Sequence, residues 1–214
     1  MLVEELRDKY LESGDLERLL HGTGIEILKD FLENWDAVLE FNRVFYAEGE
    51  PKTVLCGINP GRLGAGKTGV PFMDFRSLSK LIPGVTRDDT ERSAKFFYEV
   101  VNHFGARNFY RSFYVGNVSW VGYSKERKNI NFDALPVPAR DAVLSFFRYE
   151  MNRIKPSTVI SLGGMVQETV KRVLDASVNT DLVLPHPNYC AFPKIKDKCL
   201  RQYIEVLEPF VRTA

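Results

Sequence analysis

Short apolar runs that alternate with segments of helical periodicity constrain the fold of this chain more than any other feature. The runs are TVLCGI, FYVGNVSW, TVISLGG and DLVLPHP, which begin at Thr53, Phe113, Thr158 and Asp181. Each is short, rich in β-branched or aromatic residues and bounded by turn residues, so each predicts a strand. Because strands that alternate with helices favour a parallel arrangement, we predict an α/β fold with a mainly parallel sheet flanked by helices.

Five segments between and around these runs have the pattern of helices. Residues 26–41 repeat apolar side chains at helical spacing, and their aromatic residues are expected in the core. Residues 88–104 begin at an Asp or Thr cap and stop at Gly105. Residues 138–155 lie between Pro138 and Pro156, which favour the start and the end of a helix. The last two helices are expected at about 165–174 and 195–207.

Length and composition favour one compact domain. The chain has 214 residues, slightly many for one average domain and few for two, and 44% are hydrophobic, which is enough for a full core. Gly and Pro are scattered as turns and are not collected in a linker. We therefore expect a single domain over residues 1–214, with a helical N-terminal segment, residues 1–42, packed on it.

Charge, cysteine content and hydropathy narrow the functional classes. A formal net charge of +1 gives no global basic field, so contact with nucleic acid would depend on local clusters. Cys56, Cys190 and Cys199 are scattered, and together with three His they form no metal-ligand pattern. The N-terminal residues lack the features of a signal peptide, and no apolar window approaches the length of a membrane span. These observations predict a soluble cytoplasmic protein without a metal site or a membrane contact.

The stretch NPGRLGAGKTGVPF, Asn59 to Phe72, spells a nucleotide-binding loop. Its residues from Gly61 to Thr68 match the pattern G-x-x-x-x-G-K-[ST] and follow an apolar run. In a true phosphate loop the Lys-Thr pair opens a helix whose amides hold the phosphates, whereas Gly69 and Pro71 would stop a helix here within its first turn. The predicted strands also offer no acidic residue at their ends for magnesium. We interpret the stretch as an irregular loop and keep an ATP-binding protein as an alternative.

Polar side chains stand at the ends of three predicted strands. Asn59 ends LCGIN, Asn117 ends YVGN and His186 ends LVLPH. Because open α/β sheets bind ligands at the carboxyl ends of their strands, these three residues are expected at one sheet edge. Two of them also have a simpler interpretation. Asn59 could be a turn residue before Pro60, and Asn117 could be a buried amide bonded to a neighbouring backbone.

The sequence carries a resemblance in four motifs taken together: GINPG at Gly57–Gly61, TGVPF at Thr68–Phe72, VGN at Val115–Asn117, and HP at His186. In this order and spacing they resemble the uracil-DNA glycosylase superfamily, and most closely its single-strand-selective monofunctional branch, SMUG, with its divergent bacterial members. The resemblance covers most of the chain from about residue 43 to residue 209. It implies a three-layer α/β/α fold with a central four-stranded sheet.

The same resemblance implies an activity. It predicts a monomeric, monofunctional DNA glycosylase that hydrolyses the N-glycosidic bond of uracil in single- or double-stranded DNA without metal or cofactor and so initiates base-excision repair. By resemblance, Asn59 positions the attacking water. His186 donates a hydrogen bond to the uracil oxygen on which negative charge develops, with help from the backbone amides of residues 59–65.

The remaining base contacts are also carried by the resemblance. Phe72 is expected to stack under the everted base, although taken alone it is more typical of a core residue. Asn117 is expected to read the Watson–Crick edge, because one amide can satisfy both N3–H and O4 of uracil. Gly57, Gly61 and Ala65 complete the base pocket. The small Ala65 stands where the vertebrate relatives carry a bulkier residue, which suggests room for 5-substituted uracil or deaminated purines.

The segment after the HP motif departs from the family pattern. The sequence NYCAFP, Asn188 to Pro193, replaces the usual S-P-R-N-P, so Tyr189 or Phe192 is expected to be the wedge that fills the gap left by the everted base. Asn188, Lys194, Lys196 and Lys67 are expected near the DNA, although a solvated surface is an equally good interpretation of any single lysine. A mismatch-specific uracil and thymine glycosylase and a catalytically silent DNA-binding relative remain alternatives, and His186 argues against the first because that branch lacks this histidine.

Overall fold

The computed structural model describes residues 1–212, and the last two residues of the expected domain, 213 and 214, lie outside that range. Its centre is a four-stranded parallel sheet in the order β3-β2-β6-β7. The strands are β2 (Thr53–Gly57), β3 (Phe113–Asn117), β6 (Thr158–Leu162) and β7 (Val183–Leu184). All four lie within the runs that predicted them, and their residues from Val54 to Cys56 and from Val159 to Leu162 are fully buried, as expected for a sheet covered on both faces.

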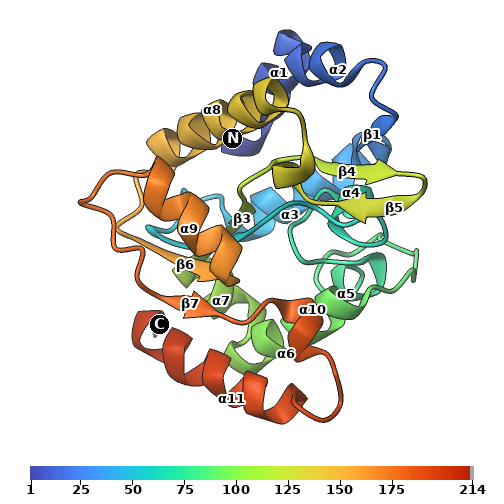
Figure 1. Ribbon diagram of the computed structural model, residues 1–214. Coiled ribbons are helices and arrows are strands. Elements are labelled where there is room, and N and C mark those ends of the chain that lie inside the picture. The colour runs from blue at the N-terminus through green and yellow to red at the C-terminus, as the bar shows by residue number, and fades with distance from the viewer. Residues whose placement is uncertain (213–214) are drawn as a thin grey trace.

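Helices cover both sides of this sheet, which gives the three-layer α/β/α arrangement (Figure 1). In the view of Figure 1, α8 and α9 lie above the sheet and α6 and α11 lie below it. The α-helices are α1 (Leu2–Ser13), α2 (Asp15–Leu20), α3 (Trp35–Phe45), α4 (Ala65–Thr68), α5 (Phe75–Leu78), α6 (Arg92–Phe104), α7 (Ala106–Ser112), α8 (Val137–Ile154), α9 (Gly164–Val173), α10 (Pro187–Cys190) and α11 (Lys196–Leu207). Short 3₁₀ turns are η1 (Asp30–Asn34), η2 (Phe132–Ala134) and η3 (Glu208–Phe210).

The predicted helix over residues 26–41 is wrong in its first half. Residues there form β1 (Ile25–Leu28), which pairs antiparallel with β4 (Gly122–Lys125), and β4 pairs with β5 (Lys128–Ile130). Gly24, at φ 71°, turns the chain into β1, and the pairing with β4 satisfies the backbone that a helix would otherwise satisfy. The N-terminal segment is therefore not wholly helical, and α3 begins only at Trp35.

The other predicted helices are close to the observed ones. The helix expected over 88–104 begins at Arg92, because the carboxylate of Glu91, rather than an Asp or Thr, accepts the Ala94 amide at 2.9 Å as its cap. The helix expected over 138–155 is α8, which follows Pro136 and ends before Lys155 in the left-handed region. Helices α9 and α11 match the last two expected segments to within a residue or two.

The edge of the central sheet is closed at β3 by a tyrosine. The Tyr46 hydroxyl donates to the Phe113 carbonyl and accepts from the Val115 amide, each at 3.2 Å. Such a bridge satisfies edge groups that would otherwise invite pairing with another chain. Over residues 1–212, no helix combines the length and apolar character required to cross a membrane.

Candidate active site

The carboxyl ends of β2 and β3 bring two motifs side by side. Gly57 is the register partner of Asn117 in the parallel ladder. The pairing continues past the strands, because the Val118 amide donates to the Gly57 carbonyl and the Ser119 amide donates to the Ile58 carbonyl, both at 2.9 Å. The loop that carries Asn59 therefore leaves the sheet directly beside the end of β3.

Gly57, Asn117 and Phe72 touch one another. A methyl group added to Gly57 would lie 2.3 Å from Asn117 Oδ1 and 2.5 Å from Phe72 Cζ, distances that no real contact allows. Position 57 must therefore be glycine for the amide and the ring to approach this closely. The Asn117 side chain is only 7% exposed, and none of the side-chain hydrogen bonds within residues 1–212 involves it. Within residues 1–212 the fully buried polar atoms that lack a partner do not include this amide, so its polar end is open to solvent, where a ligand or water can complete it.

Phe72 is held in an unusual backbone conformation. Its φ of 57° lies in the left-handed region, which bulky residues seldom adopt. The ring stacks on Phe97 of α6 at a centroid distance of 4.9 Å, and the His186 ring lies 6.0 Å away. Non-glycine residues in this region cost of the order of 1–3 kcal/mol and cluster at functional sites, so the strained Phe72 supports a role in binding.

His186 presents one free ring nitrogen. It is the N-cap of α10, and its Nδ1 accepts the backbone amide of Asn188 at 3.1 Å. Because Nδ1 is an acceptor, the proton of the neutral ring is on Nε2, which is then a donor. Burial lowers the pKa of His186 below the ordinary histidine value, and the nearby charge of Glu91 opposes that shift without reversing it. At neutral pH the ring is a neutral hydrogen-bond donor.

Asn59 is fixed by the segment that joins β5 to η2. Its Nδ2 donates to the Ile130 carbonyl at 3.3 Å, and its Oδ1 accepts the Phe132 amide at 3.2 Å. Because one partner can only accept and the other can only donate, the orientation of the amide is determined. One lone pair of Oδ1 remains, which is the group needed to hold a water molecule.

The loop after Asn59 does not form a phosphate site. The helix that opens at Ala65 ends after Thr68, where Gly69 has φ 70°, so α4 is one turn long instead of the fully irregular loop expected. The Thr68 hydroxyl is fully buried and donates to the Met73 carbonyl at 2.8 Å, so it does not face a magnesium position. Lys67, which is expected near a DNA phosphate, forms an ion pair with Asp89 at 3.4 Å.

Gly61 and Gly66 shape this loop from within. The Gly61 carbonyl accepts the amides of Gly64 and Gly66 at 3.2 and 2.9 Å, and a methyl group on Gly66 would lie 2.8 Å from that carbonyl. Arg62 is tied by its backbone amide to Asn129 Oδ1 at 3.1 Å. The small residues thus allow a tight turn that brings Ala65 to the wall beside Asn117.

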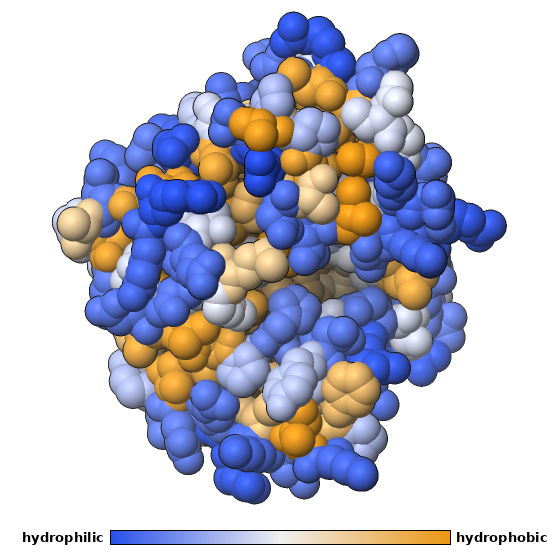
Figure 2. Space-filling model, viewed as in Figure 1, coloured by the Kyte–Doolittle hydropathy of each residue, from blue (hydrophilic) through white to orange (hydrophobic). Residues whose placement is uncertain are grey.

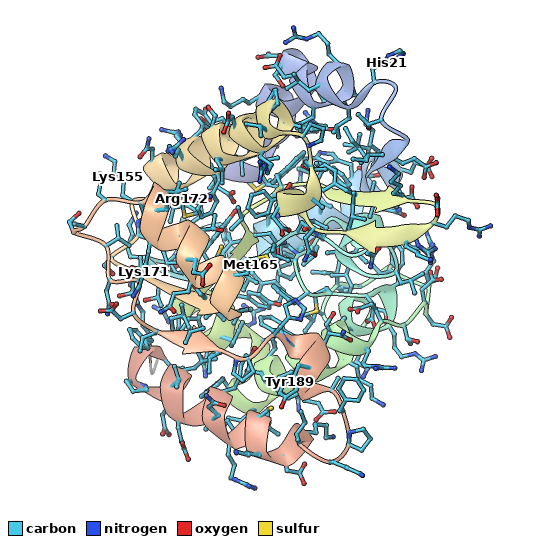
Figure 3. The ribbon with its side chains drawn as sticks, viewed as in Figure 1. His21, Lys155, Met165, Lys171, Arg172 and Tyr189 are labelled. Carbon is cyan, nitrogen blue, oxygen red and sulfur yellow. The ribbon has the colours of Figure 1, made fainter. Side chains whose placement is uncertain are left out.

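The residues expected to contact DNA are at the surface. Asn188, Tyr189, Phe192 and Lys194 are exposed, and Tyr189 and Met165 both face the viewer in Figure 3, on the face that is hollowed near its centre in Figure 2. Lys196 pairs with Glu99 at 3.0 Å, whereas Lys194 forms no ion pair within the described residues. The Arg92 guanidinium lies 5.0 Å from the centre of the Phe192 ring, which leaves Tyr189 as the less engaged aromatic side chain.

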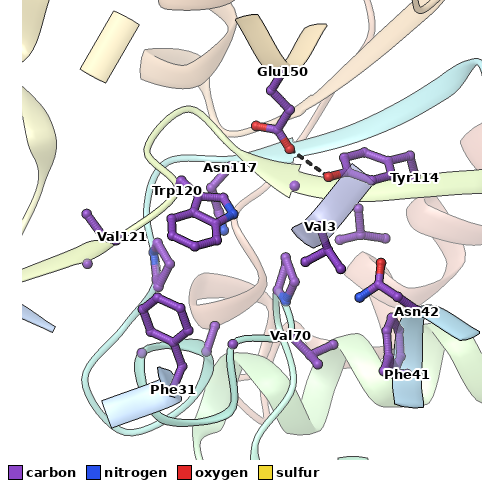
Figure 4. A pocket seen from close by; sticks show the side chains of 18 of the residues that line it. Val3, Phe31, Phe41, Asn42, Val70, Tyr114, Asn117, Trp120, Val121 and Glu150 are labelled. Atoms are coloured by element: carbon purple, nitrogen blue, oxygen red, sulfur yellow. Dashed lines mark hydrogen bonds between the residues drawn. The ribbon is translucent and has the colours of Figure 1, made fainter. Parts of the chain in front are cut away.

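A cavity of about 50 Å³ is lined by residues that include Ala65, Asn117, Tyr114 and Glu150 (Figure 4). Glu150 is buried, and one of its oxygens accepts the Tyr114 hydroxyl at 2.6 Å. Burial raises the pKa of Glu150 to about 7, and the bond from Tyr114 opposes the rise. The cavity has room for ordered water and reaches the wall of the base site.

Several residues around the site were missed by the sequence reasoning. Phe97 supports Phe72, and the charge of Glu91 raises the pKa of His186 against the effect of burial. The backbone of Ile130 and Phe132 orients Asn59, and a carbonyl or an amide leaves no mark in a side-chain pattern. Leu63 and Met165 are exposed apolar side chains that belong to none of the sequence motifs. In residues 1–212 there is no group of three or more His, Cys, Asp or Glu that could hold a metal ion.

Comparison with known proteins agrees with the geometry. Residues 44–208 match the family model of the uracil DNA glycosylase superfamily. The crystal structure of wild-type SMUG2 from Pedobacter heparinus superimposes with a TM-score of 0.74 at 27% sequence identity, over 87% of this chain and 88% of that chain. A search of curated proteins gave no significant match. The chain therefore belongs to the uracil DNA glycosylase superfamily, as a SMUG-type member, and is a DNA glycosylase-type hydrolase whose partner is DNA.

Proposed function

We propose that the protein is a monofunctional uracil-DNA glycosylase that hydrolyses the N-glycosidic bond of uracil in DNA and initiates base-excision repair. The observation that carries the proposal is the Asn117 amide, which has no hydrogen-bond partner in residues 1–212, is open to solvent and lies against Gly57, which also adjoins the Phe72 ring. An amide needs both an acceptor and a donor, and the N3–H and O4 edge of uracil supplies both. Phe72 gives this edge a stacking surface, worth roughly 1–3 kcal/mol per base.

The leaving base is stabilised by His186. As the bond from the sugar to the base breaks, electrons move onto the uracil ring and its oxygens. The neutral His186 donates from Nε2 to this charge, as a preorganised donor does in an oxyanion hole. A neutral donor has a further advantage in a buried site, because its burial carries a smaller penalty than that of a cation.

Water is held by Asn59. Its amide is too weak a base to deprotonate water, but its orientation is determined before the substrate binds. In a largely dissociative reaction the attack needs a placed water molecule more than a strong base. No residue that forms a covalent intermediate is required, and the mechanism is monofunctional.

The lesion range extends beyond uracil in this proposal. Ala65 and Asn117 both line the cavity of about 50 Å³, which would give space to a base substituent directed into it. 5-Substituted uracil and deaminated purines are the candidate lesions. Release of uracil with no release of 5-hydroxymethyluracil or xanthine under the same conditions would contradict this extension.

The wedge in this proposal is Tyr189, which is 57% exposed and next but two to His186 along the chain. Phe192 is the second candidate, and it is partly covered by Arg92. Aromatic side chains can separate base steps in the way that the proposed eversion requires. Loss of activity on double-stranded but not single-stranded substrate in Tyr189→Ala would support this assignment.

One experiment tests the activity. Uracil-containing single- and double-stranded oligonucleotides are incubated with the protein in EDTA, and abasic sites are then cleaved with alkali. Strand breaks that disappear in Asn59→Ala and His186→Ala are expected. Absence of breaks with the wild-type protein, together with ATP turnover in magnesium, would instead revive the ATP-binding alternative.

A further inference from the structure

Two backbone dihedrals next to His186 are not restricted by a proline: ψ of Pro185 and φ of His186 itself. The ring of Pro185 fixes only φ of Pro185, and Pro187 restricts ψ of His186 to extended values, in agreement with its observed ψ of 135°. The plane of the peptide that joins Pro185 to His186 is not set by either proline. If it rotated, the imidazole would move with it.

The Tyr203 hydroxyl holds this peptide plane. It donates to the Pro185 carbonyl at 2.6 Å, from a side chain of α11 that is fully buried. The Tyr203 ring is fixed in turn by an edge-to-face contact with Phe96 at 5.2 Å. Cys190 Sγ is a second, weaker donor to the same carbonyl at 3.6 Å. Tyr203 is eighteen residues from Pro185 along the chain and has no part in any of the motifs.

The other side of His186 is tied down as well. Its own carbonyl accepts the amides of Tyr189 and Cys190 at 2.9 and 3.2 Å, and Nδ1 accepts the Asn188 amide. With the carbonyls on both sides and one ring nitrogen engaged, Nε2 is the remaining ring atom that can reach a substrate. Its direction is therefore determined by the Pro185 carbonyl and the first turn of α10.

We propose that Tyr203 is a positioning residue for His186: through the Pro185 carbonyl it aims the Nε2–H bond at the leaving base. The inference rests on the proposed function, in which His186 touches that base, and Tyr203 itself touches no substrate. A displacement of about 1 Å in a catalytic group can cost of the order of 10²-fold in rate. A single distant hydroxyl can therefore matter for turnover while contributing little to DNA binding.

A matched control is available in α1. Tyr10 is also buried, and its hydroxyl donates to Glu17 at 2.9 Å, far along the chain from every motif of the site. Tyr10→Phe and Tyr203→Phe remove the same atom and one hydrogen bond each, to the Glu17 carboxylate and to the Pro185 carbonyl. An effect of lost stability alone would therefore appear in both variants.

The first measurement is the single-turnover rate of uracil release with enzyme in excess. We expect Tyr203→Phe to reduce the rate by roughly 10- to 100-fold, with DNA affinity nearly unchanged, and Tyr10→Phe to have little effect. In a His186→Ala background, Tyr203→Phe should give no further loss, because the group it aims is gone. An equal loss in both backgrounds, or a wild-type rate in Tyr203→Phe, would overturn the proposal.

The second measurement does not depend on activity. The ring ¹⁵N resonances of His186, followed by NMR through a pH titration, report the proton position and the pKa of the ring. Tyr203→Phe should move the pKa towards the ordinary histidine value, whereas Tyr10→Phe should leave it in place. Unchanged His186 resonances in Tyr203→Phe would refute the positioning role even if the wild-type protein released no uracil, a result that would separately refute the proposed function.

A third variant covers the case in which Tyr203→Phe does not fold. Cys190→Ala removes the weaker donor to the same carbonyl and leaves Tyr203 in place. The expected result is a smaller loss, about two- to threefold in rate, in the same direction. A wild-type rate in Cys190→Ala would contradict the proposal in that case. If Tyr203→Phe folds, a larger loss in Cys190→Ala than in Tyr203→Phe would assign the positioning to the thiol and contradict the proposal as well.

Discussion

Asn59 and Asn117 lie at the ends of adjacent strands of one sheet, yet their side-chain amides differ in hydrogen bonding. Both atoms of the Asn59 amide are bonded to backbone of the β5–η2 segment. The Asn117 amide is more deeply buried and has no hydrogen-bond partner in the part of the chain that the structure describes. The first amide is oriented by the backbone before a substrate arrives, and the second gains its first hydrogen bonds from whatever binds.

The contrast separates two ways in which a buried amide contributes to a site. An amide held by the backbone provides orientation and also stabilises the fold. An amide without a partner contributes nothing to the fold and reserves its hydrogen bonds for a ligand, as a site built for recognition must. The two residues should therefore respond differently to the same substitution.

The largest effect is expected for Asn59→Ala. The rate of uracil release should fall by of the order of 10²-fold, because the water loses its position. The free energy of unfolding should also fall, by about 1–3 kcal/mol, because the Ile130 carbonyl and the Phe132 amide lose their partner. Single-turnover kinetics and urea denaturation measure the two quantities, with Asn152→Ala on the exposed face of α8 as the control. Unchanged stability would show that the β5–η2 contacts are not what holds Asn59.

A pH-dependent effect of about 3 kcal/mol is expected for Glu150, the second buried polar group beside the Asn117 cavity. Its folded pKa of about 7 lies above its ordinary value of 4.5, so the folded state holds the proton more tightly. The contribution of Glu150 to the free energy of unfolding is largest at acidic pH and decreases as the pH rises from 4.5 to about 7. Glu150→Gln should therefore be more stable than the wild type at pH 8 and similar to it near the ordinary value. Urea denaturation at both pH values measures the difference in free energy of unfolding between Glu150→Gln and the wild type. An equal difference at the two pH values would contradict the prediction.

Asn117→Ala is expected to give the opposite pattern to Asn59→Ala. Uracil release should fall by about 10- to 100-fold, because a hydrogen-bonded edge of the base is lost, worth about 1–3 kcal/mol. The free energy of unfolding should stay nearly the same, because the Asn117 side chain forms no hydrogen bond within residues 1–212 and its amide is open to solvent. Denaturation of both variants under one set of conditions gives the comparison directly. A loss of stability as large as that of Asn59→Ala would mean that Asn117 has a partner in solution, and the distinction between the two amides would fail.

The smallest effect is expected at the surface lysines. Lys194 is exposed without an ion pair in residues 1–212, whereas Lys196 is paired with Glu99. Lys194→Ala should reduce the slope of log affinity against log salt by about one, and Lys196→Ala by less. Fluorescence anisotropy of labelled DNA over a range of salt concentrations measures both slopes. Equal slopes for the two variants would place the DNA elsewhere.

The sequence predicted the central sheet well because its strands are buried on both faces and appear as short apolar runs. The three-stranded sheet was missed because β1 is short and partly exposed, and its apolar residues fit a helical pattern equally well. The N-cap of α6 was assigned to the wrong residue because Asp, Thr and Glu stand together before it, and only the folded chain shows which side chain meets the amide.

The candidate site was predicted from the sequence to the extent that side chains mark it. Gly57, Phe72, Asn117 and His186 lie together, as the resemblance implied, and the contact of Gly57 with both Asn117 and Phe72 is a property of the folded chain. The sequence prediction placed Lys67 near DNA and did not anticipate its ion pair with Asp89, twenty-two residues away. Tyr203 belongs to none of the sequence motifs, because its hydrogen bond is to a backbone carbonyl.

The amino-acid sequence by itself determined the α/β class, the order of the strands along the chain and the polar residues at their ends, because these depend on local periodicity and on motifs. The tertiary structure alone decided which atoms are satisfied: the amide of Asn59 by a backbone far along the chain, the carbonyl before His186 by Tyr203, and the amide of Asn117 by nothing in the described chain. The physical reason is that hydrogen bonding and burial depend on distances between segments, which a linear pattern does not contain.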